Sequence, residues 1–253
     1  MKKFTAYTLV ALLLALAVYW MAPAFSHMSP SSIPSVSKKT RASFLQKGSS
    51  FLHDPISLEA TTFVPYEPSL DTLPETEKLP ALVKELMTRL PFGQLQKEMD
   101  GHDMTALVYN WSYPVPKDHT TDPFYDLFQE KKSSDKALQS LNQRLSAAEP
   151  VGNTMLKQYA ISYNHNHKIN SPEDIFSISI RNTTTASIFN GQGFTFSTHL
   201  MIKSDDQTLP FYVKSYIWKK GNQYRLLIAV TADSEWKLLS SDMDQLAVKG
   251  MET

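Results

Sequence analysis

The chain contains no cysteine, and its charge has no excess of either sign, with 25 basic and 25 acidic residues. Without thiols it cannot form a disulfide, an iron–sulfur centre, a thiolate zinc site or a cysteine nucleophile. Its stability must therefore come from packing of an apolar core. The balanced charge argues against bulk nucleic-acid binding, so we expect no nucleic-acid partner.

The first residues have the pattern of an export signal. Two lysines precede an apolar run, Thr8–Met21, and Ala24 and Ser26 place small residues at the end of the segment. This order is typical of a secretory signal peptide that covers residues 1–26. The alternative is an uncleaved anchor, because residues 4–25 are about long enough to span a membrane. The absence of cysteine excludes a lipoprotein.

The next segment, residues 27–78, differs in composition from the rest of the chain. It carries six prolines and a serine-rich stretch from Ser29 to Ser37. Each proline fixes φ and removes a backbone donor, so a regular helix or an interior strand is excluded there. We predict a Pro/Ser-rich linker in which residues 56–66 could add an edge strand. Residues 79–253 are then predicted to form a single α+β domain.

Two periodicities in residues 79–253 predict the elements of this domain. Apolar residues at helical spacing predict helices from Leu79 to Leu90, at 134–147, and from a cap at Asp233-Ser234 to Gly250. A period of two predicts strands at 104–113, 156–164, 174–181, 194–203, 210–219 and 224–231. The predicted fold is an antiparallel sheet of about five to six strands with helices packed on one face, a two-layer sandwich. This element order resembles that of small two-layer α/β sandwiches such as the PsbP and Mog1 group, and no sequence motif accompanies the likeness.

The last two strands allow a prediction of register. Gly221-Asn222 is a two-residue hairpin turn signal of the Gly-first type. It pairs Lys220 with Gln223, and therefore Trp218 with Arg225 and Ile217 with Leu226. One face of the hairpin then holds the aliphatic residues Val213, Ile217, Leu226, Ile228 and Val230, which we expect to meet the core.

The opposite face of this hairpin is the predicted binding surface. Tyr212, Tyr216, Trp218 and Arg225 lie on it, and aromatic side chains beside long cations supply contact area, stacking and a polar group. Two alternatives remain open. The face could be ordinary cross-strand packing, with Trp218 stacked on Arg225, or helices could cover it.

Histidines and acids suggest a second type of site. His165 and His167 are two residues apart, so in a strand they would point the same way and could share a metal ion. The alternative is a solvated turn at a strand end. A cluster of Asp100, His102 and Asp103, with Asp118, His119 and Asp122 further on, could supply a general base or could simply be loop residues. No motif indicates a nucleophile, and no cofactor is expected.

These observations favour a function without catalysis. We expect an exported protein, either periplasmic or extracellular or anchored to the outer face of the inner membrane, that is a binding or envelope-associated domain. Its partner would be a protein or an envelope component, and it would contact the membrane only through residues 4–25 if the leader is not cleaved. The alternative is an extracytoplasmic hydrolase or metal-binding protein that uses His165, His167 and nearby acids.

Overall fold

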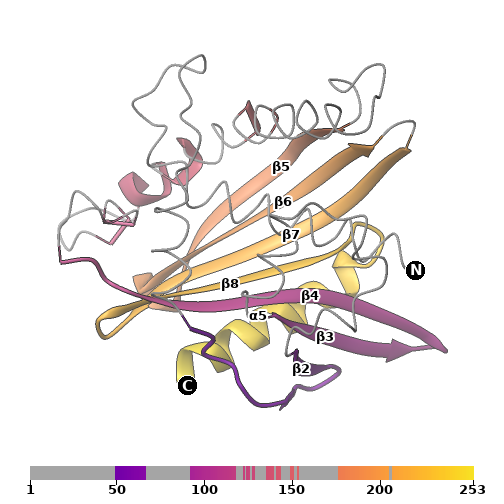
Figure 1. Cartoon of the computed structure of the whole chain (residues 1–253), viewed down its shortest axis with the longest axis horizontal. Coiled ribbons are helices and arrows are strands. Elements are labelled where there is room, and N and C mark those ends of the chain that lie inside the picture. The colour runs from indigo at the N-terminus through magenta and orange to yellow at the C-terminus, as the bar shows by residue number, and fades with distance from the viewer. Residues whose placement is uncertain are drawn as a thin grey trace, which may run out of the picture.

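The structure, a computed structural model of the chain, describes residues 49–66, 92–117, 122, 124–125, 127–128, 135–139, 141–143, 149–150, 153, 176–204 and 207–253. These residues form a curved antiparallel sheet and one long helix that lies across it (Figure 1). The predicted leader, the predicted helix from Leu79 and the predicted strand at 156–164 lie outside the described residues.

The sheet has eight strands, and every neighbouring pair is antiparallel. The strands are β1 (Ile56–Ser57), β2 (Thr62–Tyr66), β3 (Phe92–Met99), β4 (His102–Pro114), β5 (Phe176–Ile188), β6 (Gly193–Ser204), β7 (Gln207–Lys220) and β8 (Gln223–Ala232). Their order across the sheet is β1-β2-β3-β4-β8-β7-β6-β5. The prediction of an antiparallel sheet is confirmed, whereas the predicted number of five to six strands was too low.

The hairpin of β7 and β8 has the predicted register. Lys220 pairs with Gln223, and Trp218 pairs with Arg225. Gly221 has a φ of +58°, which is the left-handed conformation that a Gly-first turn requires. The face predicted to meet the core is buried at each of its aliphatic positions, Val213, Ile217, Leu226, Ile228 and Val230.

A second hairpin, formed by β3 and β4, was not predicted. Its turn is Asp100-Gly101, with φ of +55° and +74°, and it pairs Met99 with His102. Two central residues with positive φ define the type I′ turn, for which Asp-Gly is a favoured sequence. The cluster of Asp100, His102 and Asp103 therefore lies on the exposed end of a hairpin.

Helix α5 (Trp236–Glu252) packs on the sheet face opposite to the aliphatic face of the hairpin. Its stripe of Leu239, Met243, Leu246 and Ala247 is buried, as the helical spacing predicted. Each of the larger apolar side chains contributes about 1.5–3 kcal/mol by leaving water. The stripe contacts residues from the centre of the sheet, among them Tyr216, Trp218 and Leu227.

Both ends of α5 differ from the prediction. The N-cap is Glu235, which makes no side-chain capping bond, and Asp233 instead pairs with His199. The helix continues past Gly250, which was predicted to end it. A Cβ atom at Gly250 would lie 2.9 Å from Cε2 of Phe51, so the glycine permits a close approach of another segment and does not stop the helix.

The other face of the sheet is buried as well. Phe124 and Phe128 pack on Tyr224, with ring centroids 5.2 Å and 5.3 Å apart, and Phe128 also contacts Phe194. The Tyr224 hydroxyl donates to Oδ2 of Asp122 at 2.7 Å in a buried hydrogen bond. The prediction of cover on one face only was therefore wrong for the centre of the sheet, because β7 and β8 are covered on both faces.

Residues 49–66 pack into the same core as the later strands and α5. Phe51, Leu52 and Phe63 are buried in the cluster that contains Leu246. Residues 56–57 and 62–66 form β1 and β2, and β2 pairs with β3 at Phe63 and Leu95. The described part of the predicted linker therefore contributes strands and core side chains to the folded unit. The exclusion of an interior strand there was wrong, because β2 lies between β1 and β3 although it contains Pro65.

Candidate functional site

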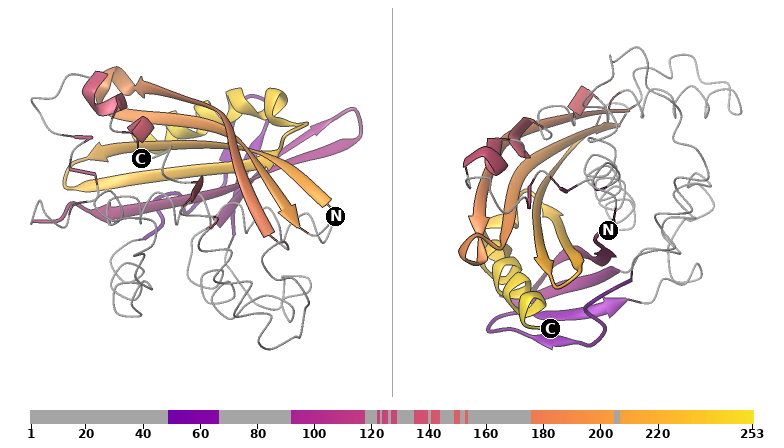
Figure 2. Two further views of the ribbon diagram at one scale, coloured as in Figure 1. Left: turned by 90° about the horizontal axis from the view of Figure 1, so that it is seen from above. Right: turned by 90° about the vertical axis from the view of Figure 1, so that its left-hand side faces the viewer.

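The sheet face that carries α5 is divided into a covered part and an open part. The helix contacts β7 and β8, whereas β5 and β6 extend beyond it (Figures 1 and 2). On the open part, Thr195, Ser197 and His199 of β6 are half-buried, and Arg181 and Thr184 of β5 are exposed. We call the open part, together with the facing side of α5, the β5–β6 face.

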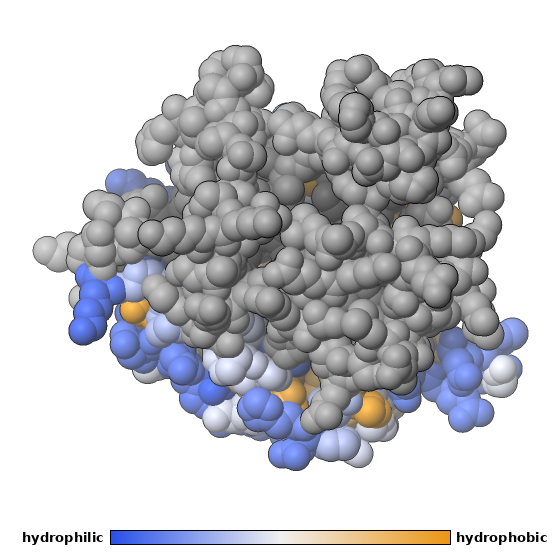
Figure 3. Space-filling model, in the orientation of Figure 1, coloured by the Kyte–Doolittle hydropathy of each residue, from blue (hydrophilic) through white to orange (hydrophobic). Residues whose placement is uncertain are grey.

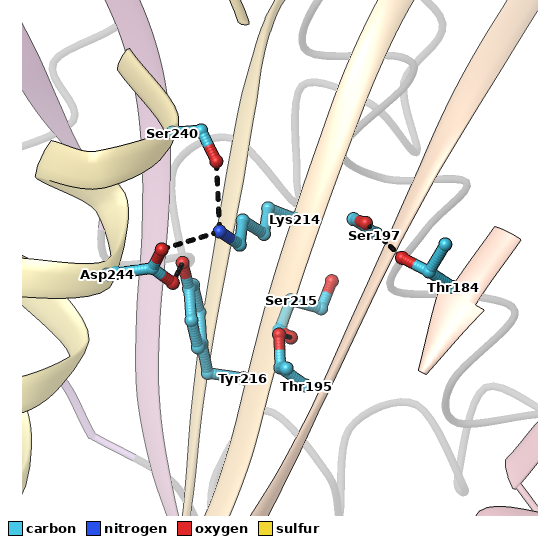
Figure 4. Close-up of polar contacts among 8 residues, drawn as sticks. All are labelled: Thr184, Thr195, Ser197, Lys214, Ser215, Tyr216, Ser240 and Asp244. Atoms are coloured by element: carbon cyan, nitrogen blue, oxygen red, sulfur yellow. Dashed lines mark hydrogen bonds and ion pairs between the residues drawn. The ribbon is translucent and has the colours of Figure 1, made fainter. Parts of the chain in front are cut away.

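A polar network joins this face to α5 (Figure 4). Lys214 of β7 donates to Oγ of Ser240 at 2.9 Å and to Oδ2 of Asp244 at 2.8 Å. The hydroxyl of Tyr216 donates to Oδ1 of the same aspartate at 2.8 Å. One carboxylate on the helix thus holds two side chains of one strand, so the network fixes where α5 lies on the sheet.

The electrostatics of this network favour a structural role. Burial, together with the negative charge of Asp244 and its hydrogen bond, raises the pKa of Tyr216 well above its usual value of 10.0. Lys214 and Tyr216 share the carboxylate of Asp244, so these contacts join β7 to α5.

Hydroxyl groups line the strands next to this network. Oγ1 of Thr184 and Oγ of Ser197 lie 2.7 Å apart, and Oγ1 of Thr195 donates to the carbonyl of Ser215 at 2.9 Å (Figure 4). These bonds hold the side chains in set orientations. The β5–β6 face therefore presents an ordered row of small polar groups.

An aromatic cluster closes the face at the start of α5. The rings of Tyr212 and Trp236 stack with centroids 4.9 Å apart at 24°, and His199 meets both of them edge-on. Nδ1 of His199 hydrogen-bonds Oδ1 of Asp233. Trp236 is only half-buried, so a rigidly held aromatic side chain remains partly accessible beside a polar pair.

Among the described residues, this histidine–aspartate pair has no third partner that would complete a hydrolytic triad. The bond to Asp233 orients the imidazole, which is one requirement of a general base. The second requirement is a nucleophile within hydrogen-bond reach of the other ring nitrogen. Among the residues that the structure describes, His199 makes no hydrogen bond to a serine or threonine hydroxyl.

The four residues predicted as a binding surface lie in the covered part of the face. Tyr212 is 5%, Tyr216 is 1% and Trp218 is 0% exposed. Arg225 lies over the ring of Phe51, not over Trp218. Of the alternatives to an exposed surface, cover by a helix is the one that the structure has. The apolar stripe of α5 packs on the aromatic residues of this face.

Half of the predicted metal and acid–base residues lie outside the part of the chain that the structure describes. His165, His167, Asp118 and His119 lie outside the described residues, and a metal site there stays a prediction. Asp122 is buried and bonded to Tyr224. Within the described ranges, no group of three or more histidine and acidic side chains could hold a metal ion.

The polar row and the His199–Asp233 pair were not predicted as a site. A signal for the row exists in β6, where phenylalanines at 194 and 196 alternate with Thr195 and Ser197. That alternation marks one polar and one apolar face. No local sequence pattern predicts the partner of His199, because Asp233 is 34 residues away in the chain.

Comparison with protein families finds no match, and comparison of the sequence with curated proteins finds none. Among solved structures, the chain is similar to the solution structure of cyanobacterial PsbP (CyanoP) from Synechocystis sp. PCC 6803. The two share 8% sequence identity with a TM-score of 0.33, over 86% of this chain and 95% of that chain. A TM-score of this size carries no inference about function.

The helices of the described residues do not reach the length and hydropathy that crossing a membrane requires. The described surface visible in Figure 3 is mainly hydrophilic, with a few apolar side chains. Over the described ranges, large apolar side chains are exposed only at Val64, Met99, Leu238 and Val248. A partner surface on this part of the molecule is therefore expected to be polar.

Proposed function

We propose that the chain is an exported, non-enzymatic binding domain, and that the β5–β6 face contacts a partner protein. The observation that carries this proposal is the unequal cover of one sheet face. The helix buries the apolar part of the face, and the part beyond it carries ordered hydroxyl groups and a half-buried tryptophan.

The composition of this face suits protein recognition. Tryptophan is enriched at the energetic centres of protein interfaces, where it gives a large contact area at low entropic cost. Stacking on Tyr212 holds the ring of Trp236 in place before any partner arrives. The hydroxyl groups of Thr184 and Ser197 can exchange hydrogen bonds with a polar partner surface.

Export rests on the leader. Residues 1–26 have the order of a signal peptide, and cleavage before His27 would release a periplasmic or extracellular protein. If the leader is not cleaved, residues 4–25 would hold the domain at the outer face of the inner membrane. N-terminal sequencing of the exported protein distinguishes the two outcomes.

Site-specific crosslinking in cells tests the binding surface. A photo-crosslinking amino acid replaces Thr184, which is exposed on the β5–β6 face, or Gln96, which is exposed on β3 far across the sheet. We expect one discrete adduct from position 184, reduced by Trp236→Ala, and none from position 96. Equal adducts from both positions, or an adduct that Trp236→Ala leaves unchanged, would count against this surface.

A matched pair of charge substitutions supplies a second measurement. Ser197→Arg places a long cation on the proposed surface, whereas Gln96→Arg places the same side chain on the distant strand. Both positions are solvent-accessible, so neither change should unfold the chain. Loss of the adduct with Ser197→Arg alone is the expected result.

A further inference from the structure

A short strap at the start of the described chain, Ser49–Leu52, is held on β4 by hydrogen bonds to Ser112 and Asn110. Ser49 and Ser112 form an isolated antiparallel bridge, with N–O distances of 3.1 Å and 2.8 Å. The buried Oδ1 of Asn110 accepts from Oγ of Ser50 at 2.6 Å and from the backbone nitrogens of Phe51 and Leu52 at 3.0 Å and 2.9 Å. Beyond the bridge at Ser49, a single side-chain oxygen thus takes the place of the backbone hydrogen bonds that a paired strand would have.

The strap inserts Phe51 into a slot between the sheet and the end of α5. The ring meets Trp218 edge-on at 5.4 Å, and the guanidinium carbon of Arg225 lies 5.0 Å from its centroid. Gly250 forms the helix side of the slot, because a Cβ there would lie 2.9 Å from Cε2 of Phe51. Phe51 is 9% exposed in this position.

The walls of the slot are held by contacts that do not involve the strap. Arg225 donates from Nη1 to the carbonyl of Gly250 at 2.7 Å and to Oγ1 of Thr253 at 3.3 Å. Phe189 packs on another edge of Trp218 with centroids 5.7 Å apart. The sheet and α5 therefore hold these walls together through contacts of their own.

The strap leaves part of the slot unsatisfied. Nε1 of Trp218 and Nε of Arg225 are buried donors, and neither has a hydrogen-bond acceptor in the described part of the chain. Buried donors normally find an acceptor. A different extended segment with a carbonyl in reach of these atoms would satisfy the slot better than the strap does.

We propose that this slot is a peptide-binding site for a phenylalanine in an extended segment of a partner protein, and that the strap occupies it in cis. The chain's own Phe51 shows which side chain the slot accepts, and Asn110 shows how the backbone beside that side chain is recognised. The slot lies at the C-terminal end of α5, whereas Trp236 of the β5–β6 face lies at its N-terminal end. The proposal does not depend on the function assigned to that face.

The test measures binding of a labelled peptide with the sequence of residues 46–55 to the full chain by fluorescence anisotropy. Strap occupancy lowers the apparent affinity for a competing peptide in proportion to the fraction of open slots. We expect Phe51→Ala, which removes the ring from the slot and leaves the strap held by its other contacts, to bind the peptide about tenfold or more tightly than the wild type. A peptide with alanine in place of Phe51 should not bind.

Two further variants separate slot binding from other causes. Phe51→Ala with Gly250→Ala narrows the vacant slot from the helix side and should lose the peptide while retaining the helical circular dichroism of the fold. Phe51→Leu keeps an apolar side chain in the slot and should give intermediate affinity, which covers the case in which Phe51→Ala fails to fold. Equal peptide affinity of the wild type and the folded Phe51 variants, or no binding to any of them, would overturn the proposal.

Discussion

The two parts of the sheet face beside α5 differ in composition although they belong to one continuous sheet. On β7 and β8, under the helix, the face carries Tyr216, Trp218 and Leu227, each with 1% exposure or less. On β5 and β6, beyond the helix, the same face carries Thr184 and Ser197, which reach solvent. Threonine and aromatic residues both suit strands, so strand propensity does not explain the difference.

The comparison teaches that cover decides which side chains a strand position can hold. Under α5, a large apolar side chain is removed from water and packs against Leu239 or Met243. Beyond the helix the strand faces solvent, where a small polar side chain stays hydrated. The network of Lys214, Tyr216 and Asp244 lies at the boundary between the two parts. It joins the edge of the helix to the last covered strand.

The largest expected effect comes from truncating the covered part. Trp218→Ala should cost about 3–5 kcal/mol of unfolding free energy, and Ile228→Ala on the opposite face about 2–5 kcal/mol, because both side chains are fully buried. Denaturant melts compare the two variants, with exposed Lys219→Ala as the control. A mild Trp218→Ala beside a severe Ile228→Ala would show that α5 covers this face only loosely.

The next effect is a pH dependence at the boundary. Burial and Asp244 raise the pKa of Tyr216 above its usual 10.0, so the folded chain keeps a phenol proton that the unfolded chain releases. The resulting stabilisation is complete below pH 10 and is lost as pH rises above it, by about 1.4 kcal/mol per pH unit for one group.

Comparison of the wild type with Tyr216→Phe isolates this contribution. Above pH 10 the stability of the variant should fall less steeply by that amount. Burial also raises the pKa of Tyr109 and Tyr224, and these groups act equally in both proteins. Urea melts between pH 8 and pH 11 measure the two slopes, which should coincide below about pH 9. Identical slopes throughout would mean that Tyr216 is exposed to solvent.

A smaller effect is expected from the boundary carboxylate itself. Asp244→Ala leaves Lys214 and the Tyr216 hydroxyl without a shared acceptor, and the cost should be about 1–2 kcal/mol. The estimate is modest because the Asp244 side chain is 55% exposed and water replaces part of the interaction. The exposed pair of Lys249 and Glu252 is the matched control, and Glu252→Ala should cost less than about 0.5 kcal/mol. Equal thermal shifts for the two variants would remove any special role for the network.

The smallest effect is expected on the open part. Ser197→Ala removes a hydroxyl that lies 2.7 Å from Oγ1 of Thr184, and stability should change by less than about 0.5 kcal/mol because water can take its place. The same variant should weaken the adduct formed at position 184. A stability loss comparable with that of Trp218→Ala would show that this part of the face is covered as well.

Much of the fold could be predicted because its information is local. The turn Gly221-Asn222 and the alternation on either side of it gave the register of β7 and β8, and helical spacing gave the stripe of α5. Asp100-Gly101 is also a hairpin turn signal, and it joins β3 to β4. This signal was missed because Asp100, His102 and Asp103 were interpreted as a loop cluster. That error removed one strand, β3, from the predicted sheet.

The candidate site could not be predicted to the same degree. Aromatic and cationic residues such as Tyr212, Trp218 and Arg225 are typical of exposed binding surfaces. Nothing in the hairpin sequence shows whether such residues are exposed or buried under another element. The distinction depends on Leu239 and Met243 of α5 and on Phe51, which precedes the hairpin by more than 150 residues. Contacts between such distant segments leave no periodic signal.

The sequence by itself determined the hairpin register and the apolar stripe of the last helix, and it predicts the export signal. Each of these features depends on residues within about one element length. Only the tertiary structure decided that both hairpin faces would be covered, where the polar row would remain open, and that Phe51 would fill the slot beside Gly250. The physical reason is that both faces of β7 and β8 are apolar enough to be buried. The packing of α5 and the strap on the sheet decides which surface stays exposed to solvent, and local sequence patterns do not specify that packing.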